Sequence, residues 1–284
     1  MKIPFHVDLK DKVAIVTGGG GILGTAFCEA LAQCGAKVAI INRTKEKAEK
    51  VAEKINASGG IALGISGDVL SVESLENAKK IITEKLGTCD ILINAAGGNH
   101  PKGITSEEYF NLESFSKDSG NTTFFDLDPE GVGYVFNLNF LGTLLPSQIF
   151  GKDMVGKKEA VIINISSMSA YAPMTKVPAY SGAKAAISNF TQWLAVHMSK
   201  VGVRVNAIAP GFFLTEQNRD LLTREDGSYT DRGNKIISQT PMGRLGNPEE
   251  LVGTLLWLVD HRASGFVTGT IIPVDGGFLA YSGV

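Results

Sequence analysis

Short apolar runs rich in valine and isoleucine alternate with helical segments in the first hundred residues, and this alternation constrains the fold more than any other feature. Strands are predicted at 12–18, 37–41, 61–66 and 89–98. Segments with apolar residues at helical spacing lie between them, and several of these end in glycine. Alternation of this kind predicts a parallel sheet built from right-handed strand–helix–strand units.

The alternation breaks at about 98–128, where the chain is polar and irregular, and then resumes. Asp128 and Pro129 predict a helix start, as an N-cap and a first helical residue. Three more strands are predicted at 160–167, 203–211 and 269–277, with helices at 129–154, 178–202 and 247–259, and a second long polar segment at about 212–246. With no linker or internal repeat, we expect residues 1–284 to form one α/β domain, a doubly wound seven-stranded parallel sheet with helices on both faces.

The composition suits a single large domain with a substantial core, since 44% of the 284 residues are hydrophobic. A formal net charge of −2, from 27 basic and 29 acidic residues mixed along the chain, favours neither a nucleic acid nor a membrane surface as partner.

No apolar run is long enough to span a membrane and no signal peptide is evident, so we expect a cytoplasmic protein. Cys28, Cys34 and Cys89 lack metal-ligand spacing and are predicted to be free thiols; no metal site is expected.

A glycine-rich stretch, "VTGGGGILG" at 16–24, joins the first predicted strand to the first helix. The general dinucleotide-binding pattern G-x-G-x-x-G fits it at Gly19, Gly21 and Gly24. A second pattern, T-G-x-x-x-G-x-G, begins at Thr17 but meets Ile22 where it requires glycine. Either pattern directs backbone N–H groups and a helix N-terminus at a phosphate.

Tyr180 and Lys184, in "AYSGAK", lie four residues apart on a predicted helix and therefore face the same way. A neighbouring ammonium favours the phenolate, and lowering a tyrosine pKa from about 10 to about 7 takes roughly 4 kcal/mol. Taken alone, such a pair is more often an ordinary feature of a helix surface. Its significance depends on the residues around it.

Ser167 ends the fifth predicted strand, at the sheet edge where parallel α/β proteins bind ligands. A hydroxyl there can bond a substrate oxygen, although a serine in this position is more often a strand-end cap. Asn139 falls in the middle of a predicted helix, where asparagine has no propensity advantage. It could support Lys184 through a water molecule.

Together these residues resemble the short-chain dehydrogenase/reductase family over essentially the whole chain, except at 98–128. The motifs that carry the resemblance are the loop at 17–24, "NAAG" at 94–97, Asn139, Ser167, Tyr180, Lys184 and "PG" at 210–211. The resemblance implies an NAD(P)-binding Rossmann fold, reversible carbonyl reduction and a homotetramer. It also makes 17–24 a cofactor loop whose middle glycine is displaced from 22 to 21, so we expect Gly20 or Gly21 to adopt the unusual backbone angles.

The resemblance implies a set of cofactor contacts. They are Gly18, Gly20, Gly21, Ile22, Leu23, Asn42, Arg43, Asp68, Val69, Asn94, Ala95, Gly97, Tyr180, Lys184, Pro210, Phe213 and Thr215. Asn42 stands where an acidic residue would bind the ribose of NAD, and Arg43 follows it. This pair favours NADP, whereas stacking of Arg43 on the adenine would allow NAD as well. Phe213 (backbone) and Thr215 are expected at the carboxamide.

The family resemblance also implies a role for each catalytic residue. Tyr180 supplies the proton, Ser167 polarises the carbonyl, Lys184 lowers the tyrosine pKa and holds the nicotinamide ribose, and Asn139 maintains a relay water. The cofactor carries the hydride chemistry, and the protein contributes position and electrostatics. A cofactor-binding scaffold without catalysis is the alternative class, but it would not need the acid–base pair.

The substrate is expected to be a sugar acid. Forty-five positions separate Asn94 from Asn139, beyond the usual family spacing, and the insert at 98–128 either lines the pocket or elaborates an oligomer surface. Asn99 and Lys102 of this insert, with Arg219 of the later loop, are expected to bind a hydroxylated anion.

Within the family, the glycine loop, the long insert and "IAPGFFLTEQNRDLL" at 208–222 resemble the D-mannonate oxidoreductase (D-fructuronate reductase) branch. That resemblance implies the reaction D-mannonate + NAD(P)⁺ ⇌ D-fructuronate + NAD(P)H + H⁺. Gluconate 5-dehydrogenase shares the core motifs and stays open as an alternative. A 3-oxoacyl reductase also stays open, although the polar inserts argue against an acyl chain.

Overall fold

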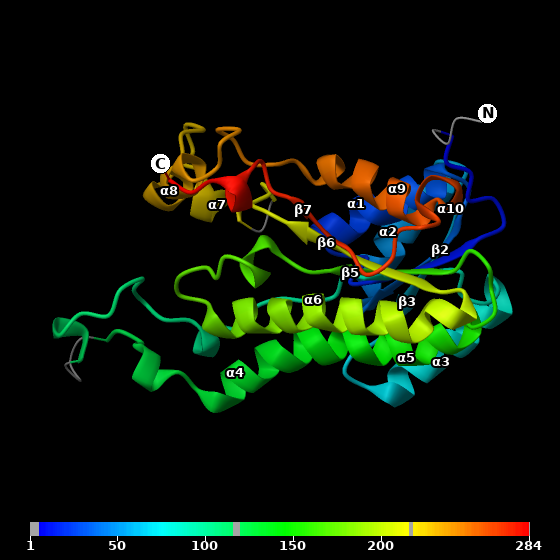
Figure 1. Cartoon of the computed structure of the whole chain (residues 1–284), viewed down its shortest axis with the longest axis horizontal. Coiled ribbons are helices and arrows are strands. Elements are labelled where there is room, and N and C mark those ends of the chain that lie inside the picture. Colours follow the sequence, from blue (N-terminus) through cyan, green and yellow to red (C-terminus); the bar gives the residue numbers. More distant parts are fainter. Residues whose placement is uncertain (1–5, 116–119, 216–217, 284) are drawn as a thin grey trace.

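The computed structural model describes residues 6–115, 120–215 and 218–283. Its centre is a seven-stranded parallel sheet in the order β3-β2-β1-β4-β5-β6-β7 (Figure 1). The strands are β1 (Val13–Thr17), β2 (Lys37–Asn42), β3 (Ile61–Ser66), β4 (Ile91–Asn94), β5 (Val161–Ile165), β6 (Arg204–Pro210) and β7 (Ile271–Val274). The order reverses between β1 and β4, which confirms the predicted doubly wound sheet.

Helices cover both faces of this sheet (Figure 1). The α-helices of the described residues are α1 (Ile22–Gln33), α2 (Lys45–Ala57), α3 (Val72–Lys85), α4 (Pro129–Phe136), α5 (Gly142–Met154), α6 (Pro178–Met198), α7 (Arg219–Leu222), α8 (Asp231–Ser238), α9 (Val252–Val259) and α10 (His261–Ser264). Helices α1, α2 and α9 pack on one face of the sheet, and α3, α5 and α6 pack on the other.

Two hydrophobic cores result, because alternate residues of each strand point to opposite faces. Val16 of β1 packs with Phe27 of α1 on one face, and Ile15 packs with Phe150 of α5 on the other. All four side chains are buried. The strands are therefore apolar on both sides, as expected for a parallel sheet covered by helices.

The helix predicted after the insert begins as expected. The Asp128 carboxylate accepts hydrogen bonds from the backbone N–H groups of Glu130 and Gly131, and Pro129 occupies the first helical position. The helix continues from α4 into α5 through a π-helical turn at Asn137–Leu141. That turn contains Asn139, whose side chain is buried.

The two polar segments lie at the same end of the molecule, beyond the carboxyl ends of the strands (Figure 1). The 98–128 insert contains short 3-10 turns, whereas the 212–246 loop contains α7 and α8, which were not predicted. Lys235 of α8 forms an ion pair with Glu108 of the insert. Residues 116–119 of the insert, and Glu216 and Gln217 of the loop, lie outside the described residues.

The described part of the chain has no helix that is both long and apolar enough to cross a membrane.

Cys28 and Cys89 are buried and Cys34 is partly buried, all as free thiols. Burial raises the pKa of each buried thiol well above its ordinary value, which keeps it protonated and unreactive. In the described residues, His, Cys, Asp and Glu side chains form no group able to hold a metal ion.

Candidate active site

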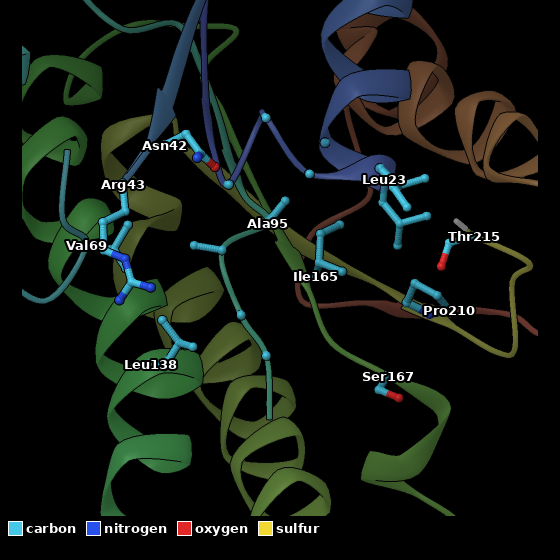
Figure 2. Close-up of a pocket in the computed structure, with 18 of the residues that line it drawn as sticks. Leu23, Asn42, Arg43, Val69, Ala95, Leu138, Ile165, Ser167, Pro210 and Thr215 are labelled. Carbon is cyan, nitrogen blue, oxygen red and sulfur yellow. The ribbon is translucent and has the colours of Figure 1, made fainter. Parts of the chain in front are cut away.

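A cleft of about 760 Å³ opens at the carboxyl ends of the strands, where the strand order reverses (Figure 2). The glycine loop after β1 and the ends of β2, β4, β5 and β6 all contribute to its walls. Figure 2 shows Asn42, Arg43 and Val69 at one end of this cleft and Ser167, Pro210 and Thr215 at the other. This is the edge at which open α/β sheets bind their ligands.

Most of the residues expected to contact a cofactor line this cleft. They are Gly18, Gly20, Gly21, Ile22, Leu23, Asn42, Arg43, Asp68, Val69, Ala95, Gly97, Tyr180, Lys184, Pro210, Phe213 and Thr215. Asn94 does not line it. The side chain of Asn94 is buried, and its Nδ2 donates to Ser147 Oγ and to Asn164 Oδ1, both at 2.9 Å. The register of β4 and β5 places Asn94 beside Asn164, so this side chain joins the strands rather than facing the cleft.

In the glycine loop, Gly18 rather than Gly20 or Gly21 has the unusual backbone conformation. Gly18 has φ +66°, and a Cβ there would lie 2.8 Å from the Ala96 backbone. Gly21 has an ordinary φ of −84°, so the expectation for Gly20 or Gly21 is wrong. The sharp turn comes directly out of β1, where the chain passes close to the end of β4.

The N-terminus of α1 faces the cleft and suits an anionic ligand. Gly21 is the N-cap residue and gives no side-chain hydrogen bond, and the first turn has no acidic residue. Ile22 and Leu23 of that turn line the cleft. A Cβ at Gly24 would lie 2.4 Å from the Gly18 carbonyl oxygen, so only glycine lets the helix approach the loop this closely. These features fit a dinucleotide pyrophosphate.

Two cationic side chains, Arg43 and Lys47, border the cleft near Asn42. Arg43 extends along the cleft wall in the neighbourhood of Val69 and Leu138 (Figure 2), and Lys47 of α2 also lines it. Asn42 Nδ2 donates to the Thr44 carbonyl at 3.1 Å. Lys47 was not predicted from the sequence, although its position in the first turn of the helix after β2 could have indicated it.

Ser167, Tyr180 and Lys184 all line the other end of the cleft. Lys184 is only 4% exposed, and its Nζ donates to the Ile165 carbonyl at 2.8 Å while lying 5.5 Å from the centre of the Tyr180 ring. Burial lowers the pKa of Lys184 to about 8. The i, i+4 spacing on α6 therefore brings the amine and the phenol together, as predicted.

The pKa of Tyr180 is shifted upward, which is opposite to the expected lowering. Burial raises this pKa because the phenolate loses solvation, and the Ser167 side chain opposes the rise. Lys184 lies over the ring face and directs its hydrogen bond at the Ile165 carbonyl. The protein alone therefore keeps Tyr180 protonated, in the form that donates a proton.

Asn139 holds the chain that follows β4. Its Nδ2 donates to the carbonyls of Gly98 at 2.7 Å and Val135 at 2.8 Å, and its Oδ1 accepts from the Gly98 N–H at 3.3 Å. A Cβ on Gly97 would lie 2.7 Å from this Oδ1 and 3.4 Å from Lys184 Nζ. Asn139, Gly97 and Lys184 are thus packed together beside the cleft.

The three residues expected to bind the substrate anion, Asn99, Lys102 and Arg219, do not line the cleft. Lys102 Nζ pairs with Asp128 Oδ2 at 2.9 Å, and the Asn99 and Arg219 residues are exposed. Here the structure differs from the prediction because charged side chains in these segments find partners or solvent at the surface.

Tyr134, Phe212 and Asn218 line the cleft instead. Asn218 fixes the turn after β6, because its Oδ1 accepts from the Thr215 N–H and its Nδ2 donates to the Phe213 carbonyl, both at 2.8 Å. Tyr134 stands one helical turn before Leu138, which also lines the cleft. Neither Tyr134 nor Leu138 belongs to a family motif, so no local signal in the sequence marked Tyr134.

A parallel sheet with a glycine-loop cleft and a serine–tyrosine–lysine group at its edge is the arrangement expected of a nicotinamide-dependent oxidoreductase. The family model described as short chain dehydrogenase matches residues 12–226. The chain belongs to the short-chain dehydrogenase/reductase family.

Particular relatives are similar along their whole length. "Uncharacterized oxidoreductase UxuB" of Bacillus subtilis is 55% identical, over 99% of this chain and 100% of its own. The crystal structure of a "putative D-Mannonate oxidoreductase" from Haemophilus influenza with bound NAD is 54% identical, with a TM-score of 0.94 and complete coverage of both chains. A "putative gluconate dehydrogenase" from Agrobacterium tumefaciens is 27% identical, with a TM-score of 0.83 over 97% of this chain and 98% of its own.

Proposed function

We propose that the protein interconverts D-mannonate and D-fructuronate with a nicotinamide cofactor. The observation that carries the proposal is the group formed by Ser167, Tyr180 and Lys184 at the end of a dinucleotide-sized cleft. The substrate is inferred from similarity, because the solved relative named for D-mannonate oxidoreductase matches the full chain, including the insert.

The proposed mechanism assigns proton transfer to this chain's own residues. When bound, the nicotinamide supplies or accepts hydride at the reacting carbon. Tyr180 donates the proton to the ketone oxygen in the reductive direction, since burial keeps its phenol protonated. The Ser167 hydroxyl hydrogen-bonds the same oxygen, and Lys184 holds the ribose and stabilises the phenolate that remains after proton transfer.

We further propose that NADP is accepted together with NAD. Arg43 and Lys47 are cations at the adenosine end, and Asn42 replaces the acidic residue typical of strict NAD use. NAD is bound by the solved relative, which supports its use here. The ratio of kcat/KM with NADPH to that with NADH measures the preference, and Arg43→Ala lowers this ratio if Arg43 contacts a 2′-phosphate.

A homotetramer is also proposed. The outer face of α6 carries stacked aromatic rings, Phe190 on Trp193 and Trp193 on His197, and Trp193 is 57% exposed rather than part of the core. Val196 is exposed beside them. A face of this kind is typical of a subunit contact. Light scattering coupled to size exclusion measures the mass, and a monomer would contradict the proposal.

The decisive experiment follows nicotinamide absorbance with NADPH and with NADH. The substrates are D-fructuronate, D-tagaturonate, 5-keto-D-gluconate and an acetoacetyl thioester. Fast turnover of D-fructuronate alone supports the proposal. Preference for 5-keto-D-gluconate would instead place the protein with gluconate 5-dehydrogenases, and preference for the thioester would place it with 3-oxoacyl reductases. Cofactor binding without turnover on any sugar acid would indicate the non-catalytic scaffold.

A further inference from the structure

One residue that lines the cleft, Tyr134, lies outside the family motifs. Tyr134 of α4 lines the cleft, together with Gly98 and Leu138. Its ring packs against the ring of His100 from the start of the insert, with centroids 5.3 Å apart and planes tilted by 58°. Tyr134 is therefore placed by a residue of the insert, whereas the catalytic residues are placed by the sheet and α6.

The position of Tyr134 is coupled to the catalytic residues through Asn139. Asn139 fixes Gly98 through two hydrogen bonds, and Gly97 lies against both Asn139 and Lys184. The chain then reaches His100 within two residues. Gly97 and Gly98 thus connect the start of the insert, which carries His100, to Asn139 and Lys184 beside the cleft.

The structure of a sugar acid suits a hydrogen-bond donor at the position of Tyr134. In D-mannonate the carboxylate is separated from the reacting carbon by four carbon–carbon bonds, so it extends well away from Ser167 and Tyr180. Lys102 and Arg219, the cations first expected to meet it, do not line the cleft. A phenol hydroxyl donates a charge-assisted hydrogen bond to a carboxylate.

His100 is held in place beside Tyr134 by its own hydrogen bond. Its Nδ1 accepts a hydrogen bond from the Lys102 N–H at 3.3 Å, so in the neutral ring the proton is assigned to Nε2. The ring is thereby held at the start of the 3-10 turn Pro101–Gly103. This arrangement holds the imidazole in one orientation against the Tyr134 ring.

We propose that Tyr134, positioned by His100, is a specificity-determining residue that donates a hydrogen bond to the substrate carboxylate. The assignment rests on the proposed sugar-acid function and deepens it. It also gives the insert a defined role, because the insert supplies His100, the residue that orients Tyr134.

The test compares the wild type with Tyr134→Phe, which removes one oxygen and keeps the ring. The wild type is first assayed on the keto-acid panel, and the keto acid that it turns over is used for both proteins. We expect Tyr134→Phe to raise KM for that keto acid at least tenfold, with kcat changed less than threefold and cofactor KM unchanged, as loss of a hydrogen bond to a charged group predicts.

A second substrate distinguishes recognition of the carboxylate from a general structural role. D-fructose carries a hydroxymethyl group where D-fructuronate carries the carboxylate. Tyr134→Phe should lower kcat/KM for the keto acid and leave that for its neutral counterpart unchanged. Equal loss on both substrates, or no loss on the keto acid, would overturn the assignment.

Two controls complete the experiment. Tyr109→Phe changes a tyrosine of the insert, which is 78% exposed and does not line the cleft, and it should behave as wild type. His100→Phe retains a ring against Tyr134 and should cause a smaller rise in KM than His100→Ala. If the wild type reduces no sugar acid, the proposed function fails; if it reduces one and Tyr134→Phe matches it, only the Tyr134 assignment fails.

Discussion

The cofactor end of the cleft is built on strand ends, whereas the substrate end is bordered by two irregular segments. Gly18 follows β1 with its α-carbon packed against the backbone that follows β4. At the other end, the insert and the 212–246 loop meet through the ion pair of Glu108 with Lys235. The first region depends on close backbone packing, and the second depends on side-chain contacts near the surface.

This difference indicates how each region tolerates change. Backbone packing has no room for an added atom, because neighbouring strands and helices cannot move apart without disturbing the core. Surface ion pairs contribute little to stability and are easily replaced. The cofactor end should therefore be sensitive to single substitutions, and the substrate end should vary without loss of the fold.

The largest effect is expected where the two ends meet, at Tyr180. Tyr180→Phe removes the proton donor and keeps the ring, so kcat should fall by about 10³-fold. Cofactor affinity, measured by fluorescence titration with NADPH, should stay within a factor of a few of the wild-type value. Turnover that hardly changes would show that the acid–base assignment is wrong.

At the cofactor end, Gly18→Ala tests the importance of close packing. The change forces a Cβ to within 2.8 Å of the Ala96 backbone at φ +66°. Gly59→Ala is the matched control, since Gly59 has φ +86° but nothing within 4 Å of the added atom. Both should lose about 1–2 kcal/mol from backbone strain.

Steric overlap should cost Gly18→Ala roughly 1–3 kcal/mol more than Gly59→Ala in urea unfolding. Gly18→Ala should also raise the cofactor KM, and Gly59→Ala should not. Equal losses in the two variants would mean that backbone strain alone, and not packing against the end of β4, limits this position.

Beneath the cofactor end, Asn94→Ala separates a structural role from a binding role. The substitution leaves buried groups of Ser147 and Asn164 without a hydrogen-bond donor, so the free energy of unfolding should fall by about 1–3 kcal/mol. The cofactor KM should stay unchanged because Asn94 does not line the cleft.

The reciprocal variant is Asn42→Ala. Asn42 lines the cleft and the hydrogen bond from its side chain to the Thr44 carbonyl is exposed, so cofactor KM should change while stability stays close to wild type. The distinction between the two asparagines would be lost if Asn94→Ala raised the cofactor KM as much as Asn42→Ala.

The smallest effect is expected at the substrate end, in Glu108→Gln. Lys235 lowers the pKa of Glu108, so the ion pair stabilises the fold above the ordinary glutamate pKa of about 4.3 and is lost as pH falls through the lowered value. The Tm difference from wild type should therefore be slight at pH 7 and absent in acid. A loss at pH 7 as large as that of Gly18→Ala would contradict the comparison between the two ends.

Much of the architecture could be predicted because it depends on local pattern. Apolar runs of β-branched residues predicted the seven strands, and the Asp128–Pro129 pair predicted the start of α4. The spacing of Tyr180 and Lys184 placed both on one face of α6. Each of these features requires only residues within a few positions of one another.

The remaining features depended on neighbours that are distant in the sequence. Gly18 needs its positive φ because the chain after β4 passes beside it, and Asn94 turns inward because Asn164 lies next to it, seventy residues along the chain. Tyr134 lines the cleft in a helix whose next turn, at Leu138 and Asn139, packs against Gly98 of a segment about forty residues earlier. The amino-acid order was thus sufficient for the elements and the acid–base group, whose periodicity is local. Outside the family motifs, which side chains face the cleft was settled only in the folded chain, because that depends on packing between distant segments.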